Sequence, residues 1–368
     1  MTAWAHGAVR RWAVVGALVG VLVGLPAVVA ALPAEDADVP AARLRDAALA
    51  SGSVGHSGYA VSAGGLSLPV TDRLTRVADL LSDRTTMRVW WRGPDEHRVD
   101  VVTAAGETGV HRDPGGTWTW DFETLTAARG EPASLALPAP PDLLPAPLGR
   151  RLLSEAADEE LTRIGARRVA GRDALGLRLE PAEEAASVDR VDVWVDRATG
   201  LPLQVQVVAE GARTPALDTR FLDLDLAVPA ASVVAFTPPP EAFVGAAPDT
   251  ADLVAEAGRR AGRLPLPLEL AGLGRRPLEG VPAAVWAYGR GVTLLAVASV
   301  PPRLAGGLRA AMRSSPEAVT DDLGVRLSAG PLGLMVVDVP RGGAYVLTGT
   351  VTLDALAAAA AALPGAAP

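Results

Sequence analysis

The sequence contains no cysteine, no lysine and no asparagine, and it has few histidines. Without cysteine it can form no disulfide, no thiolate metal site and no iron–sulfur cluster, and it lacks the lipidated cysteine of a bacterial lipoprotein. The four histidines, His6, His56, His97 and His111, show no spacing that would bind a metal ion. All 34 cationic residues are arginine and the one isoleucine is Ile164, a bias of high-GC coding without functional meaning. We therefore predict no metal and no cofactor.

Aromatic residues are also scarce, at 4%, so a core has to be built mainly from alanine, valine and leucine. The apolar fraction of 49% and the charged fraction of 21% are typical of a folding chain rather than a disordered one. A length of 368 residues leaves room for two or three domains. The formal net charge of −8 provides no broad basic surface, which argues against binding to nucleic acid.

One uncharged run, Trp12–Leu32, lies near the N-terminus. Its 21 residues are enough to cross a bilayer as a helix, which takes about 20 apolar residues. Arginines precede the run and acidic residues follow it, so the N-terminus should stay in the cytoplasm. We therefore predict that residues 1–34 are a cytoplasmic tail and a transmembrane signal anchor. The protein would then be a single-pass protein of the cytoplasmic membrane with its bulk outside.

The alternative is a signal peptide that is cleaved, which would release a secreted protein. Val28-Val29-Ala30 and Leu32-Pro33-Ala34 are the possible small-residue cleavage sites. The run is longer than the usual apolar region of about 7–15 residues, and neither site is a clean A-x-A. Both points favour the anchor.

Apolar and polar residues alternate in six runs beyond the anchor. The runs are residues 98–101, 117–122, 174–179, 191–196, 203–207 and 222–226. Such alternation is typical of antiparallel strands with one buried and one solvated face. The turn Asp196–Gly200 joins two of the runs, so Val191–Val195 and Leu203–Val208 should pair as a hairpin. In the last run, Leu222, Leu224 and Leu226 should be the buried residues.

Helices are expected at residues 40–51, 72–82 and 144–156, which makes the fold class α+β. Residues 237–250 are rich in proline and alanine and are typical of a linker. We therefore place one domain at 40–245, a linker at 246–259 and a small α+β domain at 260–364. The small domain should contain these elements: strands at 283–299, 323–328, 333–339 and 344–351, and helices at 302–313 and 352–363.

No catalytic motif is present: the chain has no G-x-S-x-G nucleophile elbow, no Walker phosphate loop and no H-E-x-x-H zinc motif. His97 and His111 lie near Asp100 and Asp113, an arrangement more typical of surface pairs than of a general base. We therefore predict a binding protein rather than an enzyme. The alternative is a hydrolase whose Ser, His and Asp are dispersed along the chain and meet only in the fold.

Tryptophan is the most informative residue type, since five of the eight lie between residues 90 and 194. Trp90 and Trp91 are adjacent and must point to opposite faces of a strand. Trp118 and Trp120 share a face, and Trp194 faces away from the valines around it. A sheet with bulky apolar groups on both faces is either covered on both or lines a ligand cavity. We take Trp90, Trp118, Trp120 and Trp194 as the candidate apolar face for a ligand or partner.

Four segments together resemble the LolA-like superfamily. They are VWWRGPDEHRV (89–99), GTWTWD (116–121), VAGRDALGLRLEP (169–181) and VWVDRATGLPL (193–203). They resemble the family's x-R-x-P…R-V/L hairpin, its W/Y-x-Y/W-D strand, its V-x-G-R-x-A-x-x-L-x-L-x-P run and its W-x-D-x-x-T-G-L-P-L hairpin. The resemblance covers residues 54–245, and residues 281–350 are similar to the second domain of the RseB/MucB group.

The resemblance implies an open antiparallel half-barrel wrapped over helices, with an apolar concave face, followed by a small α+β domain. RseB/MucB proteins bind the extracytoplasmic part of a membrane anti-sigma factor, shield it from proteolysis and release it on a lipid-type signal. It therefore implies a sigma-factor regulator whose partner is an anti-sigma factor or another membrane protein. The predicted membrane anchor distinguishes this chain from the better-known members, which are soluble after export. The alternative is a lipid or lipoprotein carrier that binds an acyl chain in the concave face. The family has no catalytic residues.

Overall fold

The structure is a computed structural model that describes seven stretches of the chain. They are residues 34–65, 84–103, 106–130, 138–246, 266–278, 285–339 and 343–365. The predicted anchor Trp12–Leu32, the predicted helix at 72–82 and all but the first residue of the predicted linker at 246–259 lie outside the described residues. Within these stretches, no helix combines the length and the apolar character needed to cross a bilayer.

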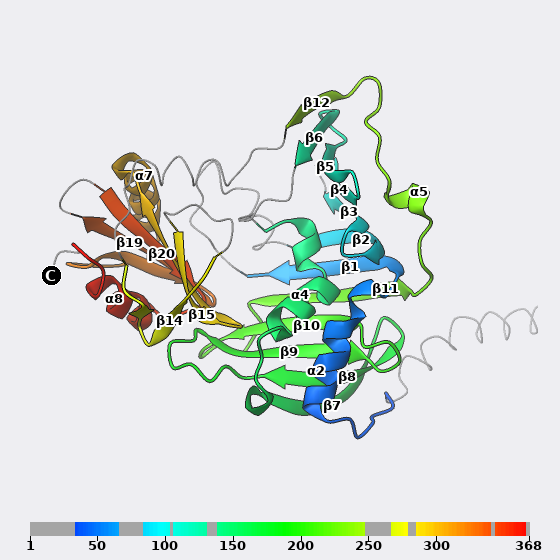
Figure 1. Cartoon of the computed structure of the whole chain (residues 1–368), viewed down its shortest axis with the longest axis horizontal. Helices are drawn as coiled ribbons and strands as arrows, with labels where there is room; N and C mark the ends of the chain where they lie inside the picture. The colour runs from blue at the N-terminus through cyan, green and yellow to red at the C-terminus, as the bar shows by residue number, and fades with distance from the viewer. Residues whose placement is uncertain are drawn as a thin grey trace, which may run out of the picture.

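The larger sheet has twelve strands in the described residues, built from two antiparallel meanders (Figure 1). The first meander comprises β1 (His56–Gly64), β2 (Arg84–Gly93), β3 (Glu96–Thr103), β4 (Gly106–Asp113), β5 (Gly116–Asp121) and β6 (Thr126–Gly130). The second meander comprises β7 (Leu161–Val169), β8 (Arg172–Leu179), β9 (Val188–Asp196), β10 (Pro202–Ala209) and β11 (Leu217–Asp225). They join where β1 pairs antiparallel with β11, from Ser57 opposite Asp225 to Gly64 opposite Leu217.

Two helices cover one face of this sheet, which we call the inner face (Figure 1). They are α2 (Ala41–Ala50) and α4 (Pro145–Leu153), with the short 3-10 turns η1 (Ser51–Ser53), η2 (Pro140–Leu143) and η3 (Asp158–Glu160) beside them. Proline at the first position of α4 costs no hydrogen bond, because the first N–H of a helix has no partner within it. A Cβ added at Gly149 would lie 2.8 Å from Cβ of Pro202, so glycine allows α4 to approach β10 closely. The helices expected at 40–51 and 144–156 are confirmed.

The predicted hairpin is confirmed, since β9 pairs antiparallel with β10 and Val193 lies opposite Val205. The assignment of Leu222 to the buried face is wrong: its side chain is 44% exposed. The register shifts there, with Phe221 opposite Ala60 and Asp223 opposite Tyr59, so Leu222 is the extra residue of a β-bulge. Phe221, the residue before the bulge, points to the inner face and is buried there.

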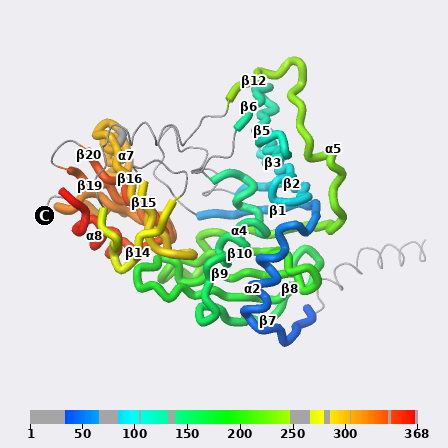
Figure 2. The backbone as a smooth tube through the Cα atoms, in the orientation of Figure 1, coloured from blue at the N-terminus to red at the C-terminus, as the bar shows by residue number. Residues whose placement is uncertain are grey.

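The segment after β11, residues 226–246, runs back along the first meander to its far edge (Figures 1 and 2). We call it the strap; it contains α5 (Ala231–Val234) and β12 (Phe243–Ala246). The sequence predicted a linker at 237–250, but β12 pairs in parallel with β6, from Phe243 opposite Thr126 to Ala246 opposite Arg129. Four residues are too few to show an alternating pattern.

The smaller sheet has eight strands in the described residues and lies beside the second meander (Figure 1). Its elements are β13 (Glu269–Leu270), β14 (Leu273–Arg276), β15 (Val285–Arg290), β16 (Thr293–Val300), α7 (Pro302–Arg313), β17 (Val319–Asp321), β18 (Gly324–Ala329), β19 (Leu332–Val339), β20 (Gly343–Gly349) and α8 (Leu353–Ala361). The predicted strands and both predicted helices of this region are confirmed. Its core is formed around Tyr288, Tyr345, Leu347 and Leu356, all fully buried.

Candidate functional site

Trp90, Trp118 and Trp120 lie on the face of the larger sheet that points away from α2 and α4, which we call the outer face. On β2, Val89 and Trp91 pack in the core of the inner face, so Trp90 points outward. Residues directly opposite in an antiparallel ladder share a face. Trp90 is opposite Arg98, Arg98 is opposite His111, and His111 is opposite Trp118. Trp118 and Trp120 therefore belong to the same face as Trp90.

The strap covers this aromatic group. The ring centroid of Phe236 lies 4.6 Å from that of His111 and 5.8 Å from those of Trp118 and Trp120. Nδ1 of His111 lies 3.3 Å from the carbonyl oxygen of Val234, and burial lowers the pKa of the His111 imidazole. Trp120 is fully buried as a result. The aromatic residues of the outer face are thus partly a second core, closed by the strap.

Trp90 is covered by an ion pair instead. The guanidinium carbon of Arg98 lies 4.9 Å from the ring centroid of Trp90. The same guanidinium holds Asp100, with Nε to Oδ1 at 2.8 Å and Nη2 to Oδ2 at 2.6 Å. The carboxylate of Asp100 is buried, so this bidentate pair fixes Arg98 over the indole.

Trp194 lies apart from the other three, on β9 of the second meander, with its ring over Gly176. A Cβ added at Gly176 would lie 2.8 Å from Cζ3 of Trp194, so only glycine leaves room for the indole. The guanidinium carbon of Arg167 lies 3.8 Å from the ring centroid of Trp194. Burial lowers the pKa of Arg167 to about 10. The structure thus brings Trp118 and Trp120 together under Phe236, while Trp90 lies on the same face with two strands between, and Trp194 lies in the other meander.

The inner face is filled by side chains rather than left as an open cavity between the described elements. The core under the helices is made by apolar residues of α2, α4 and the second meander, among them Leu44, Ala48, Leu153, Leu161, Leu175, Leu177, Leu179, Val191, Val193, Val195 and Val205. Under the first meander, the ring of Trp91 is stacked between His56, at 6.0 Å, and His97, at 4.5 Å. Burial lowers the pKa of His56 to about 4. Where α2 and α4 cover it, the inner face is therefore occupied by the protein's own residues.

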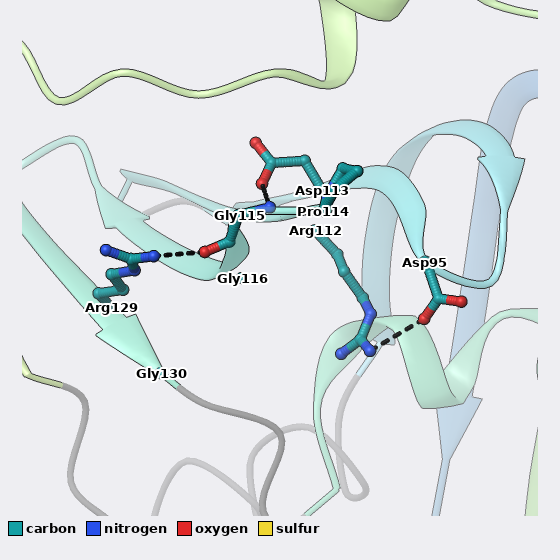
Figure 3. A pocket seen from close by; sticks show the side chains of 8 residues that line it. All are labelled: Asp95, Arg112, Asp113, Pro114, Gly115, Gly116, Arg129 and Gly130. Carbon is teal, nitrogen blue, oxygen red and sulfur yellow. Dashed lines mark hydrogen bonds and ion pairs between the residues drawn. The ribbon is translucent and has the colours of Figure 1, made fainter.

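A polar pocket of about 380 Å³ lies at the end of the first meander (Figure 3). It is lined by Asp95, Arg112, Asp113, Pro114, Gly115, Gly116, Arg129 and Gly130. These residues come from the β2–β3 turn, the β4–β5 turn and the end of β6. The sequence pattern did not indicate that these residues form a pocket, because they lie at or next to turns that meet only when the strands pair.

The junction between the two sheets is built from ion pairs around three glutamates. Arg290, at the end of β15, binds Glu160 through Nη2 and Oε1 at 2.8 Å and binds Glu183 through Nε and Oε1 at 2.8 Å. Arg276 of β14 binds Glu155 at 2.8 Å. Burial alone would raise the pKa of Glu160, but hydrogen bonds from Arg290 and from two backbone N–H groups outweigh it and lower that pKa.

Backbone hydrogen bonds reinforce the junction. The N–H of Thr352 donates to the carbonyl of Ala185 at 2.9 Å, and the N–H of Ser187 donates to the carbonyl of Thr350 at 3.2 Å. The loop between β8 and β9 is therefore bonded to the chain just before α8. Both sheets contribute to this contact through main chain and side chain.

These features define a class: an open antiparallel sheet wrapped over two helices, with a small α+β unit bonded to one end. The family model described as the MucB/RseB N-terminal domain matches residues 131–232, which include α4 and the second meander. No curated protein sequence matches the chain.

Solved structures show the same architecture over most of the chain. MucB in complex with MucA(peri) is 18% identical and covers 89% of this chain and 100% of its own, with a TM-score of 0.51. The Pseudomonas aeruginosa MucA/MucB complex gives 18% identity, 89% and 99% coverage and a TM-score of 0.51. A LolA superfamily protein from Nitrosomonas europaea gives 11% identity, 54% and 98% coverage and a TM-score of 0.25. The chain has the fold of MucB over most of its length, and residues 131–232 match the MucB/RseB N-terminal domain, which confirms the RseB/MucB resemblance seen in the sequence.

Proposed function

We propose that the protein is a membrane-tethered extracytoplasmic regulator that binds the extracytoplasmic part of a membrane anti-sigma factor. The observation that carries the proposal is the similarity to MucB along both sheets, since MucB was solved in complex with MucA. The packing of the inner face under α2 and α4 supports it as well. A carrier would need an open apolar cavity of several hundred Å³, whereas a partner-binding regulator needs only its surface.

Tethering through Trp12–Leu32 belongs to the same proposal. Confining two proteins to one membrane raises their effective concentration, as a short linker does for two joined modules. The predicted anchor ends at Leu32, and Asp36 is already held by Arg163 at 2.7 Å, ahead of the packed helix α2. At about 3.3–3.6 Å per residue, the folded part would then begin within roughly 15 Å of the bilayer surface.

The test is an affinity purification of the full chain from detergent-solubilised membranes, with protein and lipid both identified by mass spectrometry. We expect one stoichiometric single-pass protein whose cytoplasmic part binds a sigma factor. The matched control is the same chain with residues 34–368 alone, which should recover less of the same partner because the effective concentration is lost. Recovery of acyl lipid without a specific protein would contradict the proposal and support the carrier.

A second measurement tests the anchor. We expect the protein to remain with membranes after a high-salt wash and to retain its N-terminal residues. A mature N-terminus at Ala31 or Glu35, with the protein in the soluble fraction, would refute tethering while leaving partner binding to be judged by the purification.

A further inference from the structure

The middle of the strap, residues 230–242, is fixed at both ends but only lightly in between. Before it, Arg92 of β2 donates through Nη1 to the carbonyl of Pro229, and after it β12 pairs with β6. Between these points, among the residues that the structure describes, one hydrogen bond joins the strap to the sheet, from Nδ1 of His111 to the carbonyl of Val234. A segment with so few bonds to the rest of the fold opens at low cost in free energy.

Two apolar side chains of the strap complete this contact. Val234 is 1% exposed, and the half-buried ring of Phe236 lies against His111, Trp118 and Trp120. The imidazole of His111 thus contacts the strap twice, through a hydrogen bond and through a ring, and it is buried by these contacts. Opening of the strap would bring water to this imidazole and to both indoles at once.

The charged groups nearest to His111 come from the sheet and not from the strap, because residues 226–240 contain no titratable side chain. β3 contributes Arg98 and Asp100. A Cβ added at Gly109 would lie 3.0 Å from both Oδ1 of Asp100 and Nε2 of His111, so these two groups face each other across the glycine. The carboxylate of Asp100 is already paired with Arg98, and Arg98 disfavours a protonated His111 more than Asp100 favours it.

Two further charged groups lie on the same face of the sheet. Asp113 accepts a hydrogen bond in the β4–β5 turn from the N–H of Gly115 at 2.7 Å. Arg129 of β6 lies beyond Trp118, with 5.7 Å between its guanidinium carbon and the ring centroid. Burial has the largest effect on His111 and lowers the pKa of its imidazole below the usual 6.5. The closed strap therefore favours neutral His111, whereas an open strap would let water surround the protonated ring.

We propose that residues 230–242 form a pH-sensitive latch, which leaves the outer face when His111 takes up a proton and so uncovers Trp118 and Trp120. The open state binds one proton more than the closed state, so closure is strongest above pH 6.5 and weakens as the pH falls. The latch goes beyond the proposed function and does not depend on the identity of the partner. The signal is acidification of the surroundings, and the response is an aromatic surface exposed while both ends of the strap stay attached.

The absence of cysteine allows a direct test by thiol labelling of the full chain. Val234→Cys places a single thiol under the closed latch, and the matched control Ala230→Cys places one at an exposed position of the same strap. The ratio of the two labelling rates cancels the pH dependence of the thiol itself. We expect this ratio to rise as the pH falls from 7.5 to 5.5, by up to about tenfold per pH unit, the limit for one proton.

His111→Asn identifies the titrating group, because its side-chain amide can still donate to the carbonyl of Val234 but takes up no proton. In this background the labelling ratio should stay constant with pH. The matched control His97→Asn changes a buried histidine of the inner face and should leave the rise intact. A rise that persists in His111→Asn, or a constant ratio in the chain that keeps His111, would overturn the proposal.

Hydrogen exchange of the unsubstituted chain gives a readout that needs no variant to fold. The N–H groups of Val233 and Ala235 bond within the single turn of α5, which would not persist away from the sheet. After correction for the intrinsic pH dependence of exchange, their protection should fall between pH 7.5 and 5.5 while the amides of β9 and β10 stay protected. Constant protection of α5, or a loss that includes β9 and β10 and so reports global unfolding, would contradict the latch.

Discussion

The two meanders of the larger sheet bury their residues in different ways. The second meander packs leucine and valine under α2 and α4, with residues such as Leu177 and Val193 fully buried. The first meander places rings on both faces: His56, Trp91 and His97 stack inside, and Phe236 of the strap covers the outer side. The buried acids of the second meander, Asp192 and Asp196, are paired with Arg178 and Arg172. The first meander, whose buried histidines have lowered pKa values, is the part that should respond to pH.

The largest effect is expected in the second meander, from Leu177→Ala. Leu177 is fully buried in the core under the helices, so truncation removes apolar burial and leaves a cavity. The free energy of unfolding should fall by about 3 kcal/mol. Urea unfolding of residues 34–368, followed by circular dichroism, measures it.

The control is Leu222→Ala at the exposed bulge of β11, which should change the free energy of unfolding by less than about 0.5 kcal/mol. Equal losses in the two variants would show that the bulge residue is buried in solution.

The first meander should instead respond to pH. His56 is buried and its pKa is lowered from 6.5 to about 4, so the unfolded chain binds more protons between these values. Stability from this group is therefore complete above pH 6.5 and is lost as the pH falls towards 4. The loss amounts to about 3 kcal/mol at the lower limit, at about 1.4 kcal/mol per pKa unit. Urea unfolding at intervals from pH 7 to pH 4 measures it.

His56→Asn is the matched variant, because its amide N–H can replace Nδ1, which lies 2.9 Å from the carbonyl oxygen of Val54. It should show a shallower fall in stability between pH 6.5 and 5, whatever its absolute stability. The window above pH 5 is chosen because the carboxyls of Glu155 and Glu160, whose pKa values are lowered in the fold, are mostly ionised there in both the folded and the unfolded chain, so the junction adds little slope. An unchanged slope would exclude His56 as the titrating group.

Removing the aromatic residue of the strap should have a moderate effect. Phe236→Ala deletes a half-buried ring that touches His111, Trp118 and Trp120. We expect a loss of about 1–2 kcal/mol, a red shift of tryptophan emission and faster proteolysis within the strap. Val228→Ala, an exposed position of the same strap, should leave all three readouts unchanged. A red shift without faster cleavage would mean that the strap stays in place.

The smallest effect is expected at the junction with the smaller sheet. Arg290→Ala removes the partner of Glu160, whose side chain is only 4% exposed, and should raise the pKa of that carboxyl because burial remains. Arg290 is itself partly exposed, so the expected loss is about 1 kcal/mol. Hydrogen exchange of the Ser187 and Thr352 amides, which bond across the junction, should accelerate. Arg303→Ala should not accelerate it, and equal exchange in both variants would argue against a role for the ion pairs.

The sequence predicted the second meander better than the first, for a physical reason. Strands β8 to β10 alternate because one face is covered by helices and the other carries partly buried ion pairs such as Arg178 with Asp192. β4 shows no alternation, because Val110 points into one covered face and His111 into the other, and both are buried. A strand that is covered on both faces does not show the alternation of apolar and polar residues.

The candidate site was predicted in part. Because Trp90 and Trp91 are adjacent on one strand, the sequence predicted that they point to opposite faces of the sheet, and in the structure they do. The sequence did not indicate that Phe236 would cover Trp118, since the two residues meet only through the return of the strap. Nor did it indicate the pocket, whose arginines belong to different hairpins. Long-range pairings of this kind leave no local pattern.

The position of β1 in the middle of the sheet determines when the larger sheet can be completed. β1 is made early, yet its second neighbour is β11, with Ser57 opposite Asp225. The chain is synthesised from its N-terminus onward. One side of β1 therefore stays unpaired until β11, the last strand of the second meander, has been made. Closing so long a loop is slow, and an unpaired strand can pair wrongly with other chains. Assembly of this protein should therefore depend on protection of β1 while the chain is incomplete, and a chain truncated before β11 should aggregate rather than fold.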